Sequence, residues 1–436
     1  MKLRRTIGIP SAALSLVALA LLLGVFAVGD RPAVVTASAF AGGQSGQSVP
    51  TRAFAWEQFN LFLSAGNGDN DWGPWSTWKT KCQLGLVLQG PNCPPQSSNP
   101  PPAAPDLGTL VMSGLEIPVQ DKLFEQTLKA PFDAGLLAGS VQSASCNLAR
   151  PSPCGAILYN AKAAGHIQKY GLASLDAFIS THPAPSSIPA FPAGSVIVKS
   201  VWGFLGSTTG QLSVWNYSDD LFHMVPVDRD KSRHCTAQAY PIPDGNSNIQ
   251  KIPLDCFKSV LVTASTTPNP GSVGAGIHAV AGDHYVLLGI HILRKTEAGW
   301  VWSTFWWSND PAGNPEWNGG RTGLANTAKW SHYVANMTTD INGPDGKRIN
   351  CFNPYIELRQ MQNDTVSNCV LCHQFTAYKP VTNGFTLGSP ALDGATTPAD
   401  GTFTGKAKVD YLWTLADEPG NAGKPVPVQP PAPKPK

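Results

Sequence analysis

The chain has 436 residues, of which 42% are hydrophobic and 14% are charged, so it can bury a large core and is too apolar to be disordered. Its 42 glycines and 39 prolines argue against a helical bundle, a coiled coil or a helical solenoid. Thirty-one basic and 29 acidic residues give a formal net charge of +2 without a basic stripe, so we expect no nucleic-acid partner.

The N-terminus resembles an export signal. Three of the first five residues are basic, and they precede an uncharged stretch over residues 6–29 and the small-x-small pattern Ala39-Phe40-Ala41. We expect residues 1–41 to be a signal peptide or an uncleaved N-terminal anchor, which would be the only attachment to a membrane. Because the basic end stays inside, both interpretations place the rest of the chain outside the cytoplasm, periplasmic or secreted.

The expected fold class is α+β, with a mainly antiparallel β sheet, a helical segment around 120–182 and a short helix leading into residues 369–373. Hydrophobic residues recur at helical spacing in the first region, and the spacing changes to a period of two from about residue 190. We expect strands over 195–204, 211–217, 284–294 and 299–307, the last two forming a hairpin. The expected divisions are 42–105 (a Trp-containing segment and a Pro-rich loop), 106–189 (helical), 190–424 (a β-rich domain) and 425–436 (a disordered Pro/Lys tail).

All nine cysteines follow the export signal, where an oxidising compartment favours disulfide pairing. Three pairs are close enough in sequence to close short loops, namely Cys82 with Cys93, Cys146 with Cys154, and Cys235 with Cys256. The sequence does not fix this connectivity. Cys351 has no evident partner.

The segment Cys369-Val-Leu-Cys372-His373 has the pattern of c-type haem attachment. Two thiols at this spacing add to the vinyl groups of a haem, and the following histidine reaches the iron. The alternatives are a Cys369–Cys372 disulfide and half of a zinc site, but no second Cys/His pair has suitable spacing. We therefore predict one covalent haem c, anchored by Cys369 and Cys372, with His373 as the iron ligand.

The sixth iron ligand separates the candidate functions. An electron carrier closes its iron with methionine or a second histidine, whereas an open position binds or activates small molecules. Met224 and Met337 are candidates for the closing ligand, although neither lies in a distal-ligand motif. Met361 lies only eight residues before Cys369, too close to reach the opposite face of a haem.

The order of these features resembles the cytochrome P-460 and cytochrome c′-beta family. It consists of a strand ending in Val198-Lys199, a hairpin with a tryptophan-rich second strand over 299–307, the Cys-x-x-Cys-His motif, and a closing Asp410-Tyr-Leu-Trp-Thr. The resemblance covers scattered blocks between about 190 and 415. It implies a mostly antiparallel β fold with one haem c near the C-terminus, and binding or oxidation of nitric oxide, hydroxylamine or related nitrogen species.

The same resemblance implies roles for Lys199 and His291. Lys199 stands where family members have a lysine that cross-links to the haem, although Ser200 follows it where the family usually has an acid. The structural alternative is a lysine whose stem covers the sheet while its ammonium reaches water. His291 is expected to present a polar group to the distal pocket, for iron ligation or proton transfer. The structural alternative is a hydrogen-bonded core histidine.

The sequence therefore predicts an exported haem c protein with redox or gas-binding activity on a small molecule. Its partner is a small-molecule ligand or a redox partner protein, and an oxidoreductase would use His291 and Lys199 as catalytic residues. One alternative is a six-coordinate electron-transfer cytochrome closed by His291 or a methionine. Another is a secreted binding protein without haem, in which Cys369 and Cys372 form a disulfide.

Overall fold

The computed structural model describes part of the chain. The described residues are 52–63, 74–86, 154–173, 175–182, 186–208, 210–216, 221–230, 234–235, 240, 242, 251–262, 280–313, 320–321, 328–347, 349–351, 353–355, 368–374, 376–378, 407–412 and 415. The expected export signal, the Pro-rich loop and the C-terminal tail lie outside these residues. Within them, no helix combines the length and apolar character needed to cross a membrane.

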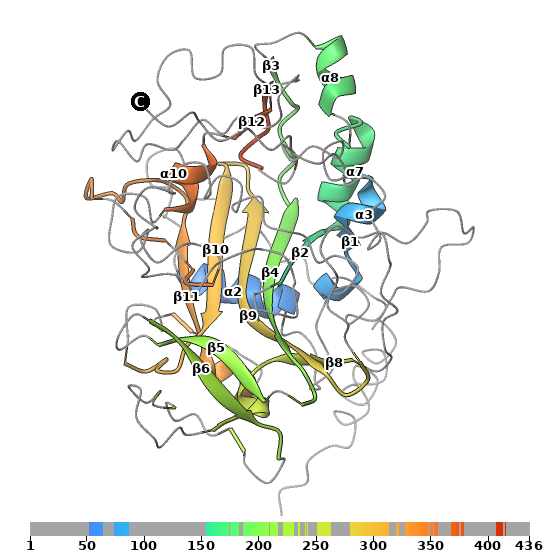
Figure 1. The fold of residues 1–436 in the computed structure, drawn as a ribbon. Helices are drawn as coiled ribbons and strands as arrows, with labels where there is room; N and C mark the ends of the chain where they lie inside the picture. The colour runs from blue at the N-terminus through green and yellow to red at the C-terminus, as the bar shows by residue number, and fades with distance from the viewer. Residues whose placement is uncertain are drawn as a thin grey trace, which may run out of the picture. The chain divides into compact units, whose positions relative to one another are not determined.

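A seven-stranded sheet organises the described residues, and every strand pair in it is antiparallel (Figure 1). Its order is β1 (Lys79–Thr80), β2 (Cys154–Tyr159), β4 (Val196–Leu205), β9 (His284–Lys295), β10 (Trp300–Trp307) and β11 (Tyr333–Thr338), with β8 (Ser259–Leu261) also paired to β9. The mainly antiparallel β architecture expected from the sequence is confirmed. The expected β9–β10 hairpin is also present, and its turn is closed by a 2.7 Å hydrogen bond from the Thr296 amide to the Gly299 carbonyl.

Two small sheets accompany the main one. The first contains β5 (Gln211–Asn216), β6 (Leu221–Asp228) and β7 (Ile252–Pro253). The second contains β12 (Ala377–Tyr378), β13 (Ala407–Lys408) and β3 (Ser186–Ser187), and it joins the C-terminal part of the chain to the segment before β4.

The helices within the described residues are few and short. They are α2 (Arg52–Leu63), α3 (Lys81–Leu84), α7 (Ala161–Lys169), α8 (Leu175–Thr181) and α10 (Cys369–His373), with 3-10 turns η2 (Pro74–Thr77), η3 (Leu254–Cys256) and η4 (Ala328–His332). The sequence predicted a helical stretch over residues 353–368 that leads into the motif. Residues 353–355 and Asn368 are not helical, and residues 356–367 lie outside the described residues. The short helix α10 is the Cys-x-x-Cys-His motif itself.

The expectation of a helical segment around 120–182 is wrong for residues 154–159, which form strand β2. Ile157 and Leu158 pack into different hydrophobic clusters, because a strand sends successive side chains to opposite faces. Asn160 ends the strand and starts α7, since its side-chain oxygen accepts a 2.9 Å hydrogen bond from the Ala163 amide. The helical pattern is correct from Ala161 onward, and residues 120–153 lie outside the described part of the chain.

Different helices pack on the two faces of the main sheet. Phe305 of β10 contacts Trp56 and Phe59 of α2, with ring centroids 5.1 and 4.6 Å apart. The neighbouring Trp302 has the opposite parity and contacts His373 of α10. Helix α2 therefore covers one face of β10 and α10 the other, consistent with their positions behind and in front of the sheet in Figure 1.

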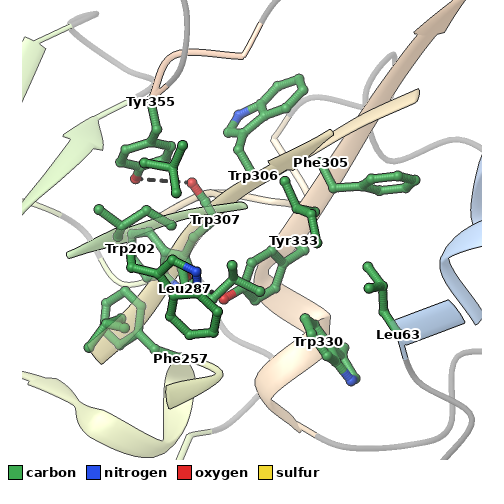
Figure 2. Packing of buried hydrophobic residues seen from close by; sticks show 14 of the residues in the cluster. Leu63, Trp202, Phe257, Leu287, Phe305, Trp306, Trp307, Trp330, Tyr333 and Tyr355 are labelled. Carbon is green, nitrogen blue, oxygen red and sulfur yellow. Dashed lines mark hydrogen bonds between the residues drawn. The ribbon is translucent and has the colours of Figure 1, made fainter. Parts of the chain in front are cut away.

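Aromatic side chains fill the core at the end of the sheet nearest β5 and β6. Figure 2 shows Trp307, Tyr333 and Tyr355 packed together there. The buried hydroxyls of Tyr333 and Tyr355 donate hydrogen bonds to the carbonyls of Leu287 and Trp307, at 2.6 and 3.2 Å. These bonds satisfy the polar ends of rings whose apolar bodies are buried.

Candidate functional site

Asn368 holds α10 in place. Its side-chain oxygen accepts a 3.0 Å hydrogen bond from the Leu371 amide, which caps the helix. Its side-chain nitrogen donates to the carbonyls of Asp340 and Ile349, at 3.0 and 2.9 Å. Asn368 is buried, so these bonds tie the five-residue helix firmly to the segment after β11.

His373, the last residue of α10, has a defined ring orientation. The centroid of its imidazole ring lies 4.2 Å from the centroid of the Trp302 ring, and its Nδ1 lies 2.7 Å from the Tyr411 carbonyl oxygen. A carbonyl only accepts, so Nδ1 carries the proton, and the lone pair of the neutral ring is on Nε2. A hydrogen bond of this kind on the far nitrogen is typical of metal-binding histidines.

The backbone turn at Asp410 and Tyr411 positions that carbonyl. Both residues have left-handed backbone angles, with φ of 47° and 67°, which are unusual without glycine. The Asp410 carboxylate stabilises the turn by pairing with the Lys295 ammonium at 2.9 and 3.1 Å and accepting a 2.9 Å bond from the Phe191 amide. The left-handed turn therefore depends on an ion pair with the end of β9.

Lys199 and His291, predicted as catalytic residues, are direct cross-strand partners on β4 and β9. The same row continues through Thr304 of β10 and Asn336 of β11. Cross-strand partners point to the same face, and Trp302 has the same parity as Thr304 on β10, so this polar row lies on the face covered by α10. His291 and Asn336 are buried, whereas Lys199 is partly buried.

Electrostatics connect this row to the motif histidine. Loss of hydration lowers the pKa of His373 to about 3, and the charges of His291 and Lys199 lower it further, against the opposing effect of the Tyr411 carbonyl. His373 is therefore neutral at pH 7, which is the form that binds a metal. The structure brings together three residues that were predicted from separate parts of the sequence.

Asn353 lies against the sheet beside the polar row. It is fully buried, and its side-chain nitrogen donates hydrogen bonds of 2.9 Å to the Thr304 hydroxyl and to the Phe305 carbonyl. Gly289 leaves room for it, since a Cβ at that position would lie 2.9 Å from the Asn353 side-chain oxygen. A glycine in the middle of a strand here allows close approach of the covering segment.

Cys369 has a neighbour that the sequence did not indicate. Its Sγ lies 3.5 Å from the Sγ of Cys351, and both side chains are buried. This contact gives Cys351 the partner that it lacked. The side chain of Cys372 is outside the described residues, so the structure does not bear on the predicted role of that thiol or on a Cys369–Cys372 disulfide.

The methionines considered as iron ligands do not lie in the described site. Met337 is opposite Ser303 in the β10–β11 pairing, so its side chain has the parity of the face covered by α2. Met224 is 44% exposed on β6, and Met361 is outside the described residues. Among the described residues, His291 rather than a methionine lies on the face of the sheet that α10 covers.

Several supporting groups were missed by sequence reasoning. The Tyr411 carbonyl, the Asp410–Lys295 pair and the Asn353 contact all depend on distant backbone positions, which no local pattern reveals. The Asp-Tyr pair at 410–411 was noticed only as part of a resemblance. Comparisons with protein-family models, with curated proteins and with solved structures give no match.

Proposed function

We propose that the chain is an exported haem c protein that binds or transforms a small molecule, with its haem attached at Cys369 and Cys372 and ligated by His373. The observation that best supports this is the 2.7 Å hydrogen bond from His373 Nδ1 to the Tyr411 carbonyl. It selects the tautomer whose Nε2 binds iron, in a motif whose spacing suits thioether attachment.

The side chains of the described residues are chemically suited to hold a haem. His373 is neutral and orientated, and Cys369 is a thiol that is not in a disulfide. The Cys351 sulfur beside it sets a condition, because Cys369 can form either a thioether or a disulfide but not both. Haem attachment therefore requires that Cys369 stays reduced until the haem arrives.

The haem would supply electron transfer and an iron position for the ligand. The chain supplies the surroundings. The Tyr411 carbonyl holds the imidazole of His373 and increases its basicity, while Trp302 packs against the ring and restricts its rotation. On the neighbouring strands, the His291 imidazole can act as a proton donor or acceptor for the ligand, and the Lys199 ammonium favours an anionic ligand or product.

The resemblance to the cytochrome P-460 and c′-beta family points to nitric oxide, hydroxylamine or a related nitrogen species as the ligand. Such molecules are small and exchange protons as they are oxidised or reduced. A site with a histidine and a lysine as cross-strand partners suits that chemistry.

A six-coordinate electron-transfer cytochrome is the second candidate. It is favoured by the position of His291, whose charge affects the pKa of His373 across the site. If His291 closes the iron, a small molecule has no position to bind, and the protein passes electrons to a redox partner.

One experiment separates these two functions. The protein is produced in a host with c-type haem maturation, and the spectrum of its reduced form is recorded before and after addition of carbon monoxide. We expect the haem bands to shift, because the iron has an open position. Haem bands that do not shift in the wild-type protein would contradict small-molecule binding. If carbon monoxide shifts the bands of His291→Gln but not those of the wild-type protein, His291 is the ligand that closes the iron. The control is His182→Gln, at an exposed histidine that follows α8 directly.

A further inference from the structure

A second cluster of ligand-type side chains lies apart from α10, in the described residues that precede β8 and β11. Cys235, Cys256 at the end of η3 and His332 at the end of η4 each contribute one sulfur or ring nitrogen, and these atoms lie within 4.8 Å of one another. All three side chains are buried, at 6%, 0% and 0% exposed. Ninety-seven residues separate the first from the last, so no local spacing signals the cluster.

His332 has one ring nitrogen with a lone pair available to a metal. Its Nδ1 lies 3.3 Å from the Ser308 carbonyl, which can only accept, so the proton is on Nδ1. Its Nε2 is buried, and the side chain that interacts with the ring is the Cys235 thiol. A thiol is a weak hydrogen-bond partner for a buried nitrogen, and a bound cation would satisfy the nitrogen better.

The ring and both cysteines are rigidly held. Trp307 stacks on the His332 ring with centroids 5.6 Å apart, and its indole nitrogen donates a 3.1 Å bond to the Cys256 carbonyl. The Cys235 amide donates a 3.2 Å bond to the Asp255 carboxylate. These contacts preorganise the ligand atoms, as supporting hydrogen bonds do around metal ions.

We propose that Cys235, Cys256 and His332 bind one zinc ion. Two sulfurs and one imidazole form a ligand set typical of zinc, and two thiolates neutralise its charge in a buried site. Binding releases two thiol protons to water and involves no oxidation. Three ligand atoms are present among the described residues, and water can take the fourth tetrahedral position.

A Cys235–Cys256 disulfide is the competing arrangement. It would need an oxidant to accept two electrons, and it would leave the Nε2 of His332 buried without a partner. The geometry therefore favours the metal over the disulfide.

The test uses the purified full-length chain. Elemental analysis is expected to find about one zinc per chain, and X-ray absorption at the zinc edge is expected to show two sulfur neighbours at about 2.3 Å and a nitrogen at about 2.0–2.1 Å. The zinc edge is separate from the iron edge, so the result does not depend on whether a haem is bound. Cys256→Ser should retain less than about a tenth of the zinc, and Cys351→Ser, a buried cysteine outside the cluster, should retain all of it.

Peptide mapping of the wild-type chain without reducing agent keeps the proposal testable if Cys256→Ser fails to fold. Unlinked Cys235 and Cys256 peptides together with bound zinc support the site. A linked Cys235–Cys256 peptide in full yield, zinc content near zero, or copper in place of zinc would each overturn it.

Discussion

At the residue scale, the proposed haem attachment gives the Cys369 sulfur two competing reactions. The thiol of Cys351 lies 3.5 Å away, close enough for oxidation to join them after a small movement. A haem vinyl group would need the same sulfur. Under the proposal, Cys351 competes for the attachment site, so its removal tests the proposed chemistry directly.

For this reason we expect Cys351→Ala to raise the haem-to-protein ratio when haem is attached under oxidising conditions. The substitution removes the sulfur that competes for Cys369 and keeps the site apolar. The ratio is measured from the absorbance of the denatured protein. A lower ratio than in the wild-type chain would contradict the competition.

Asp410 is the second residue with a specific prediction. Its carboxylate pairs with Lys295 and accepts a bond from the Phe191 amide, which together support the turn that orientates His373. We expect Asp410→Ala to lower the free energy of unfolding by about 1–3 kcal/mol, measured by urea denaturation. The exposed Asp345→Ala should change it by less than about 1 kcal/mol. Equal effects of both substitutions would show that the ion pair has no special role.

At the scale of elements, the close contact between β9 and the segment around Asn353 determines how that segment packs on the sheet. Strand β9 has Gly289 where the Asn353 side chain approaches, so the two segments meet without an intervening side chain. The Asn353 hydrogen bonds to β10 depend on that approach. The close packing of the Asn353 segment on β9 therefore depends on the absence of a side chain at Gly289.

Gly289→Ala should lower the free energy of unfolding by about 1–3 kcal/mol, because the new methyl group would lie 2.9 Å from a buried and hydrogen-bonded amide. The matched control is Gly165→Ala in α7, where nothing lies within 4 Å of the new Cβ. That change should stabilise the protein by about 0.5–1 kcal/mol. Thermal unfolding measures the stability of both variants. If Gly289→Ala leaves the stability unchanged, the close contact is contradicted.

The start of β9 carries a prediction about pH. Loss of hydration, and then the charge of Arg229, lower the pKa of His284 to about 4 from 6.5. In the unfolded chain the histidine takes up its proton near pH 6.5, so its contribution to stability is present above that pH and is lost as pH falls from 6.5 to 4. The loss is on the order of 1–2 kcal/mol once partial exposure is allowed for.

Denaturation at several pH values checks this. The free energy of unfolding of His284→Gln should depend less on pH between 6.5 and 4 than that of the wild-type chain. The exposed His182→Gln should keep the wild-type dependence. If both variants follow the wild-type curve, His284 does not contribute to acid sensitivity.

At the scale of the whole molecule, the sequence predicted the strands better than the contacts between them. The long strands β4, β9 and β10 have clear patterns, and the hairpin between the last two follows from their short separation. β2 was mistaken for helix because its six residues lie directly before the helical spacing of α7, and only the side chain of Asn160 marks the boundary.

The candidate site shows the same limit. The motif at 369–373 is local, so the sequence was sufficient to predict it. The pairing of Lys199 with His291 depends on strand register, and the Cys351–Cys369 contact depends on how a distant segment lies on the sheet. Residues brought together by tertiary structure leave no periodic signal in the sequence.

The most direct test of the central claim is the mass of the denatured chain and of its peptides, for protein made in a host with c-type haem maturation. We predict one added haem, located on the peptide that contains residues 369–373, and none in Cys369→Ala/Cys372→Ala. A chain with no added haem and with Cys351 linked to Cys369 would contradict the proposal and indicate a disulfide in its place.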